Sequence, residues 1–278
     1  MSLAVPTIDV NADPGSPIDL MPARPSPGPR EMALVGGLAF FLTVFSGTLL
    51  QLAHARAGFV LSQALFIVLP VLLAIRWFYL DRRRVLPFGR PRPRVLMGAL
   101  LGAAGLNHLL TTYGNWQESV APTPEPIRAL FDGLFAYRGP VDFVVLLLVF
   151  SIVPALCEET LFRGFLQAGL MNHLGTPAGG IVVSALIFGL FHLDPWRFAG
   201  VFGLGVFLAW LRYESGSLVP SMAAHALSNL ISISLKAMGR LEGTKPPAGI
   251  AGALLATAAL AASIWLVRTP ERPADRVL

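Results

Sequence analysis

Three short clusters of polar residues interrupt long apolar runs of this sequence, and their side chains are those of acid–base chemistry. The clusters are Glu158, Glu159 and Arg163; Phe188 and His192; and His225 and Asn229. An ionisable side chain within a membrane span costs about 2.5 to 3.5 kcal/mol on insertion scales. Carboxylate, imidazole and amide groups are what hydrolysis of an amide needs, namely a base for water and donors for an oxyanion. The pattern therefore indicates a catalytic site.

Helical spacing sorts these side chains into roles. Glu159 and Arg163 are four residues apart and lie about 40° from one another around a helix, so they can form an ion pair. Glu158 lies about 140° from Arg163 and has no partner on its own helix. His225 and Asn229 are again four apart and project from one face. We therefore predict a structural pair, Glu159 with Arg163, beside a site of Glu158, His192, His225 and Asn229.

Composition identifies the solvent of this chain. Of its 278 residues, 54% are hydrophobic and 13% are charged, with a mean hydropathy of +0.65. A soluble domain is about one quarter charged, so lipid is the expected solvent. The net charge of +5 comes from arginines in short loops between apolar runs, which argues against a nucleic-acid partner. The single cysteine, Cys157, excludes internal disulfides and a cysteine-built metal cluster.

Apolar runs of about 20 residues predict an all-α, polytopic transmembrane helical bundle of about eight spans. The expected spans are 32–53, 57–80, 95–113, 141 to beyond 157, 178–191, 198–211, 218–235 and 249–267, with a short surface helix at 127–137. Glycines in these runs, such as Gly105 and Gly205, are expected at close contacts between helices.

The flanks and loops predict the domain limits and the orientation. Residues 1–30 are rich in Pro, Gly and Asp and are expected to form a disordered cytoplasmic tail. Residues 31–268 form a single membrane domain with a motif-bearing core at about 141–236, and 269–278 form a C-terminal tail. The arginine-rich loop 81–94 is expected in the cytoplasm, together with both termini. Lys236, Arg240 and Lys245 would then lie outside, against the trend.

In order, EETLFR (158–163), FGLFH (188–192) and HALSN (225–229) resemble the motifs of the CPBP intramembrane protease family. That family includes the type II CAAX prenyl endopeptidases and the bacterial Abi or bacteriocin self-immunity proteins. The resemblance covers about residues 141–236. The other helices are similar only in being hydrophobic.

The resemblance implies a multi-pass protease of the bacterial inner membrane that cuts a membrane-associated protein or peptide near the bilayer. Some bacterial relatives process C-terminal anchors of other proteins and others give immunity to peptide toxins, and prenylated substrates are not expected. By this resemblance Glu158 is the essential glutamate, and His192, His225 and Asn229 complete the site. We assign Glu158 and His192 to the water, and His225 and Asn229 to the oxyanion.

Other functions and a metal mechanism are alternatives. A polytopic transporter would add a second polar layer at another depth, and a non-enzymatic immunity or scaffold protein would tolerate Glu158→Gln. Glu158, His192 and His225 are also the ligand types of a catalytic zinc site. Zinc would leave the water without a base, because spacing commits Glu159 to Arg163. We therefore predict a glutamate-dependent hydrolase with no required cofactor, with zinc as the alternative.

Depth raises one difficulty for this site. Counted from the expected span ends, Glu158 lies toward the cytoplasmic side and His192 lies near the outer end. The two side chains would meet only if the fourth helix is shifted, tilted or broken, for instance by a fold-back after Gly164 or Gly169.

Overall fold

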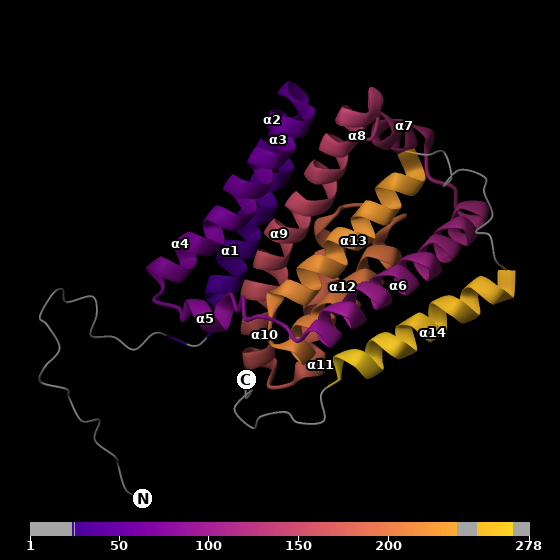
Figure 1. Cartoon of the computed structure of the whole chain (residues 1–278). Coiled ribbons are helices and arrows are strands. Elements are labelled where there is room, and N and C mark those ends of the chain that lie inside the picture. Colours follow the sequence, from indigo (N-terminus) through magenta and orange to yellow (C-terminus); the bar gives the residue numbers. More distant parts are fainter. Residues whose placement is uncertain (1–23, 25, 238–248, 269–278) are drawn as a thin grey trace, which may run out of the picture.

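In the computed structural model, the apolar runs form helices that pack side by side (Figure 1). The structure describes residues 24, 26–237 and 249–268, so most of the expected tails, as well as Arg240 and Lys245, lie outside it. In chain order, with η marking π-helical turns, the elements are α1 (Pro29–Phe41), η1 (Leu42–Gly47), α2 (Thr48–Ala53), α3 (Ala55–Ser62), η2 (Gln63–Val68), α4 (Leu69–Trp77), α5 (Arg82–Val85), α6 (Pro93–Val120), α7 (Glu125–Leu134), α8 (Gly139–Leu147), η3 (Leu148–Ile152), α9 (Val153–Glu159), η4 (Thr160–Leu166), α10 (Gln167–Leu174), α11 (Pro177–Phe191), α12 (Phe198–Ser215), α13 (Leu218–Ala237) and α14 (Gly249–Val267). The predicted all-α bundle is confirmed.

Six helices within the described ranges are long and apolar enough to cross a membrane. They are Pro29–Ala53, Ala55–Trp77, Pro93–Val120, Gly139–Leu174, Leu218–Ala237 and Gly249–Val267. The expected count of eight is therefore not confirmed. Of the two expected spans that are not among the six, α11 has only 15 residues, and α12 ends in the polar sequence Arg212 to Ser215.

Small residues let these helices approach closely, as the sequence predicts. α14 packs along α6, and a Cβ at Gly105 would lie 2.7 Å from the carbonyl oxygen of Ala256. α11 packs along α12, and a Cβ at Gly205 would lie 3.2 Å from Cβ of Ala185. Without lipid-driven hydrophobic force between helices, such close van der Waals contact is what associates them.

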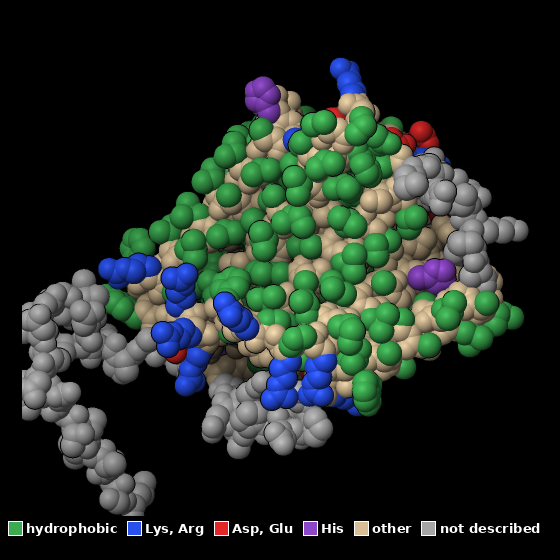
Figure 2. Space-filling view, in the orientation of Figure 1, with side chains coloured by type: hydrophobic (Ala, Val, Ile, Leu, Met, Phe, Trp, Pro, Cys, Tyr) green, Lys and Arg blue, Asp and Glu red, His purple; other side chains and the backbone are tan. Residues whose placement is uncertain are grey.

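The arginine-rich loop lies at one end of the bundle. Hydrophobic side chains cover much of the face seen in Figure 2, whereas Lys and Arg gather along its lower edge. Asp81 caps α5 by accepting from the backbone N–H of Arg83 at 2.8 Å. The loop also holds the turn between α12 and α13, because Ser217 Oγ donates to the carbonyl of Gly89 at 2.7 Å. That this end faces the cytoplasm stays a prediction.

The opposite end carries α7 and the start of α8 (Figure 1). Here Arg56 pairs with Asp142, and Lys236 Nζ lies 2.5 Å from Asp132 Oδ1 on α7. An acidic partner offsets the charge of Lys236, so this residue is weak evidence against the orientation that the arginines indicate.

The fourth long helix corrects the expected depths. α8 to α10 form one continuous helix of 36 residues, with π-helical turns but no fold-back after Gly164 or Gly169. At 1.5 Å per residue, Glu158 lies about 24 Å before the end of α10 and His192 about 22 Å after the start of α11. Because a two-residue turn joins α10 to α11, the two side chains reach the same level. The sequence estimate was wrong because the helix continues well beyond its apolar run.

Candidate active site

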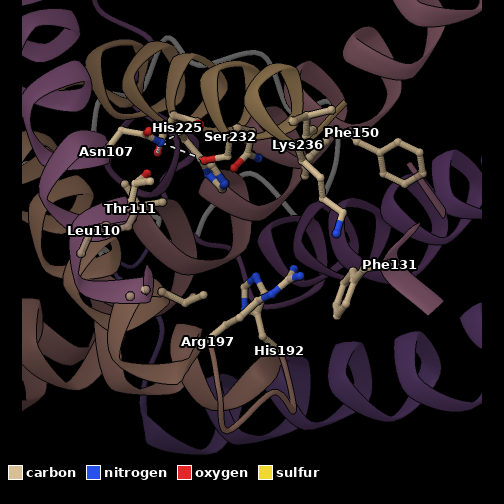
Figure 3. Close-up of a pocket in the computed structure, with 18 of the residues that line it drawn as sticks. Asn107, Leu110, Thr111, Phe131, Phe150, His192, Arg197, His225, Ser232 and Lys236 are labelled. Atoms are coloured by element: carbon tan, nitrogen blue, oxygen red, sulfur yellow. Dashed lines mark hydrogen bonds between the residues drawn. The ribbon is translucent and has the colours of Figure 1, made fainter. Parts of the chain in front are cut away.

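All four residues predicted for the site line one cavity of about 520 Å³. Glu158 comes from α9, His192 from the end of α11, and His225 and Asn229 from α13. Figure 3 shows His192 and His225 on opposite walls, with Asn107, Thr111 and Ser232 near His225. The three clusters therefore meet in space, as the sequence predicted.

The two carboxylate oxygens of Glu158 have different neighbours. Oε1 accepts a hydrogen bond of 3.1 Å from Nε2 of Gln63. Oε2 lies 3.9 Å from Nε2 of His225, too far for a direct hydrogen bond. The side chain is 12% exposed, and it borders the cavity. One oxygen is thus held by the protein, and the other faces an imidazole across a gap.

Glu159 and Arg163 form the ion pair that their spacing predicts. Glu159 Oε1 lies 3.1 Å from Arg163 Nη1, and both side chains have no exposed surface. Arg163 also donates from Nη2 to the carbonyl of Gly205 at 3.2 Å, and its guanidinium stands 4.2 Å from the ring centroid of Phe188. The pair ties α9 and η4 to α11 and α12.

His225 has a second partner that spacing along one helix could not reveal. Its Nδ1 lies 3.1 Å from Oε1 of Glu159, and the residue is only 3% exposed. With a hydrogen on Nδ1 donated to the carboxylate, Nε2 is directed toward Glu158. Glu159 therefore orients a site imidazole as well as pairing with Arg163.

His192 is oriented by its own helix. Its Nδ1 donates to the carbonyl oxygen of Phe188 at 2.8 Å, which leaves Nε2 as the free nitrogen. The ring of Phe188 packs edge-on against His192 at 4.8 Å and against His225 at 5.8 Å between centroids. Phe188 thus packs against both imidazoles of the site.

Two buried amides near the site were missed by the sequence interpretation. Asn107 on α6 donates from Nδ2 to the carbonyl of Ser228 at 3.1 Å and to Oγ of Ser232 at 2.8 Å, so it fixes α6 to the helix that carries His225 and Asn229. Gln63 holds Glu158. Each is a lone amide in an apolar run, which was the available signal.

Basic and aromatic side chains also line the cavity. Arg197 stands 3.5 Å from the ring centroid of Phe131 on α7, and its Nε lies 3.4 Å from Oδ2 of Asp194. Lys236 also lines the cavity (Figure 3). Cys157 packs against the core cluster of the N-terminal helices.

The positions of the possible metal ligands bear on the zinc alternative. Within the described residues, no three His, Cys, Asp or Glu side chains are grouped so that they could hold one. Glu158, His192 and His225, the expected His₂Glu set, come from three different helices around the cavity. The side chains as positioned do not fit a zinc centre, although whether catalysis needs a metal stays a prediction.

Residues 140–231 match the family model described as type II CAAX prenyl endopeptidase Rce1-like. This match covers about a third of the chain and is consistent with the resemblance of its three motifs to the CPBP family. The Rce1-like segment runs from the start of α8 into α13 and contains all three motifs. No curated protein and no solved structure matches the chain significantly. The chain is thus a multi-pass membrane protein with a segment similar to a protease family, and Gln63 and Asn107 lie outside the matched segment.

Proposed function

We propose that this protein is an intramembrane endopeptidase that hydrolyses a peptide bond of a membrane-associated protein or peptide. The observation that carries the proposal is the meeting of Glu158, His192, His225 and Asn229 on one cavity within the Rce1-like segment. The cavity is bordered by apolar side chains such as Phe188, and a low local dielectric strengthens charge interactions there.

The reaction begins with a water molecule between Glu158 and the imidazoles. Glu158 Oε2 removes a proton from the water, and His192 Nε2, its free nitrogen, helps to orient the water. The hydroxyl oxygen bonds to the scissile carbonyl carbon, and the carbonyl oxygen takes the electron pair. The oxyanion then re-forms the C=O bond, the C–N bond breaks, and the proton on Glu158 passes to the leaving nitrogen. The products are an amine and a carboxylic acid, which loses its remaining proton to solvent.

His225 and Asn229 stabilise the oxyanion of this intermediate. The Asn229 amide is a donor in any protonation state. His225 gives one hydrogen to Glu159 from Nδ1, so Nε2 donates to the oxyanion only when the ring carries both protons. The assignment therefore requires His225 to act as an imidazolium, with Glu159 as its counter-ion.

The test compares the termini of membrane proteins in a deletion strain that expresses either the wild type, Glu158→Ala or Glu158→Gln. We expect a defined set of new termini with the wild type and none with either variant, at equal amounts of protein in the membrane. Transport or scaffolding functions predict identical termini in all strains. Termini that persist with Glu158→Gln would refute the assignment of the base.

A further inference from the structure

The first two long helices, Pro29–Ala53 and Ala55–Trp77, form an N-terminal hairpin. Gln63 is the one residue of this hairpin with a described hydrogen bond to a proposed catalytic side chain. It lies at the junction of α3 and η2 and, along the sequence, well before the matched residues 140–231. Its Nε2 donates to Glu158 Oε1 at 3.1 Å, and the residue is only 4% exposed. Burying an amide among apolar residues costs free energy that a hydrogen bond only partly offsets. A role for Gln63 beyond packing would explain why an amide stands at this position.

The backbone around Gln63 supports the contact. Gln63 begins the π-helical turn Gln63–Val68, and α9 packs against this turn. Such turns occur frequently at functional sites, because the extra residue re-aims the side chains that follow. Glu158 lies two residues before another π-helical turn, Thr160–Leu166. Both partners of the hydrogen bond thus lie beside local departures from regular helix.

The hydrogen bond makes the two oxygens of Glu158 unequal. One lone pair of Oε1 is engaged by the N–H of Gln63, which makes this oxygen the weaker base. Oε2 lies 3.9 Å from His225 Nε2, too far for a hydrogen bond, so its lone pairs are open to a water molecule. A proton taken from water is therefore best placed on Oε2, from where it can reach the leaving nitrogen.

We propose that Gln63 is a positioning residue for the reaction, because it fixes the Glu158 carboxylate and directs protonation to Oε2. This inference rests on the proposed function. It gives the N-terminal hairpin a part in catalysis, although that hairpin lies outside the family match.

The chain offers a matched control. Gln167 is 1% exposed, and its Nε2 donates to the carbonyl of Ala209 at 2.8 Å rather than to the site. Gln63→Met and Gln167→Met each replace a buried amide by a side chain of similar length. Both purified variants are compared with the wild type on a synthetic peptide that spans a cleavage site found by the terminus comparison. We expect Gln63→Met to lose kcat by about tenfold or more with KM nearly unchanged, and Gln167→Met to keep kcat.

Gln63→Glu separates positioning from packing. At low pH the introduced carboxyl is protonated and can donate to Oε1 in place of the amide. At high pH it is ionised, and two adjacent carboxylates repel one another. The other titratable or charged groups described around Glu158 are unchanged in this variant; they are His225 on α13, His192 at the end of α11, and Cys157, Glu159 and Arg163 on its own helix. We expect its kcat, divided by the wild-type value at each pH, to fall about tenfold from about pH 6 to about pH 9.

The outcomes are distinct. A wild-type kcat for Gln63→Met, an equal loss in Gln167→Met, or a kcat ratio for Gln63→Glu that does not change with pH would each overturn the role of Gln63. If instead Glu158→Gln cleaves the peptide as well as the wild type, the proposed function itself fails, and the inference fails with it.

Discussion

Glu159 Oε1 lies 3.1 Å from Nδ1 of His225 and 3.1 Å from Nη1 of Arg163. One fully buried carboxylate oxygen thus joins the first motif to the third. The contact explains why two adjacent glutamates are useful here. Glu158 faces the cavity as the proposed base, and Glu159 holds the neighbouring imidazole in place.

Removing either member of the buried ion pair should destabilise the protein. Glu159→Ala or Arg163→Ala strands a buried charge, so each should cost about 3 to 5 kcal/mol of unfolding free energy. The double variant should cost clearly less than the two single losses together, because neither Glu159 nor Arg163 is then buried without the other. Unfolding of the purified protein in detergent measures all three. Additive losses would show that the two side chains are not coupled.

Asn229 should matter for rate more than for stability. Loss of one oxyanion donor costs about 10² to 10³ in kcat, so Asn229→Ala should be slowed to that extent on the synthetic peptide. Thr111→Val, which changes another residue of the cavity lining, is the control and should cleave normally. An Asn229→Ala variant with wild-type kcat would remove the residue from the mechanism.

Two glycines of α6 should respond oppositely to alanine. A Cβ at Gly105 would lie 2.7 Å from the Ala256 carbonyl oxygen, so Gly105→Ala should push α14 away and lower the melting temperature. Within 4 Å of a Cβ at Gly114, the described residues leave open space. Gly114→Ala should therefore stabilise the helix by up to about 1 kcal/mol. The thermal unfolding of both variants gives the sign directly.

The arginine-rich loop should be inaccessible from outside the cell. In a Cys157→Ser background, Gly89→Cys should resist an impermeant thiol reagent in intact cells, whereas Gly133→Cys on α7 should react. Both positions have open space for a side chain with respect to the described residues. The reverse labelling pattern would invert the topology.

Activity should survive the removal of metal. Exhaustive chelation, followed by elemental analysis, should leave a zinc-free protein that still cleaves the synthetic peptide, because Glu158 itself supplies the base. Activity that is lost and then restored by one equivalent of zinc would contradict this and would make Glu158, His192 and His225 candidate ligands.

The sequence predicted the helices well because apolar length is a direct physical requirement of a bilayer. Each expected span corresponds to a described helix, and so does the short surface helix expected near Phe131. The pair Glu159 and Arg163 was also accessible, since spacing of four residues on one helix fixes geometry. The meeting of three motifs on one cavity followed from the family resemblance.

Contacts between helices could not be predicted in this way. The bonds of Gln63 to Glu158 and of His225 to Glu159 join residues 95 and 66 positions apart, and helical periodicity contains no information on such pairs. The depth of Glu158 failed for a related reason. The depth of Glu158 was counted from the end of the apolar run, but the helix continues to Leu174, so the end of the helix was placed too close to Glu158.

The shortness of α11 has a consequence for the bilayer itself. Its 15 residues span about 22 Å, whereas the hydrocarbon core is about 30 Å thick. Such a hydrophobic mismatch is relieved by local thinning of the lipid around the short element. His192 stands at the end of α11, so if α11 crosses the bilayer, such thinning would lie over the proposed site. The headgroup layer and its water would then come down to the cavity, and a reaction that consumes water could proceed without an aqueous channel through the protein.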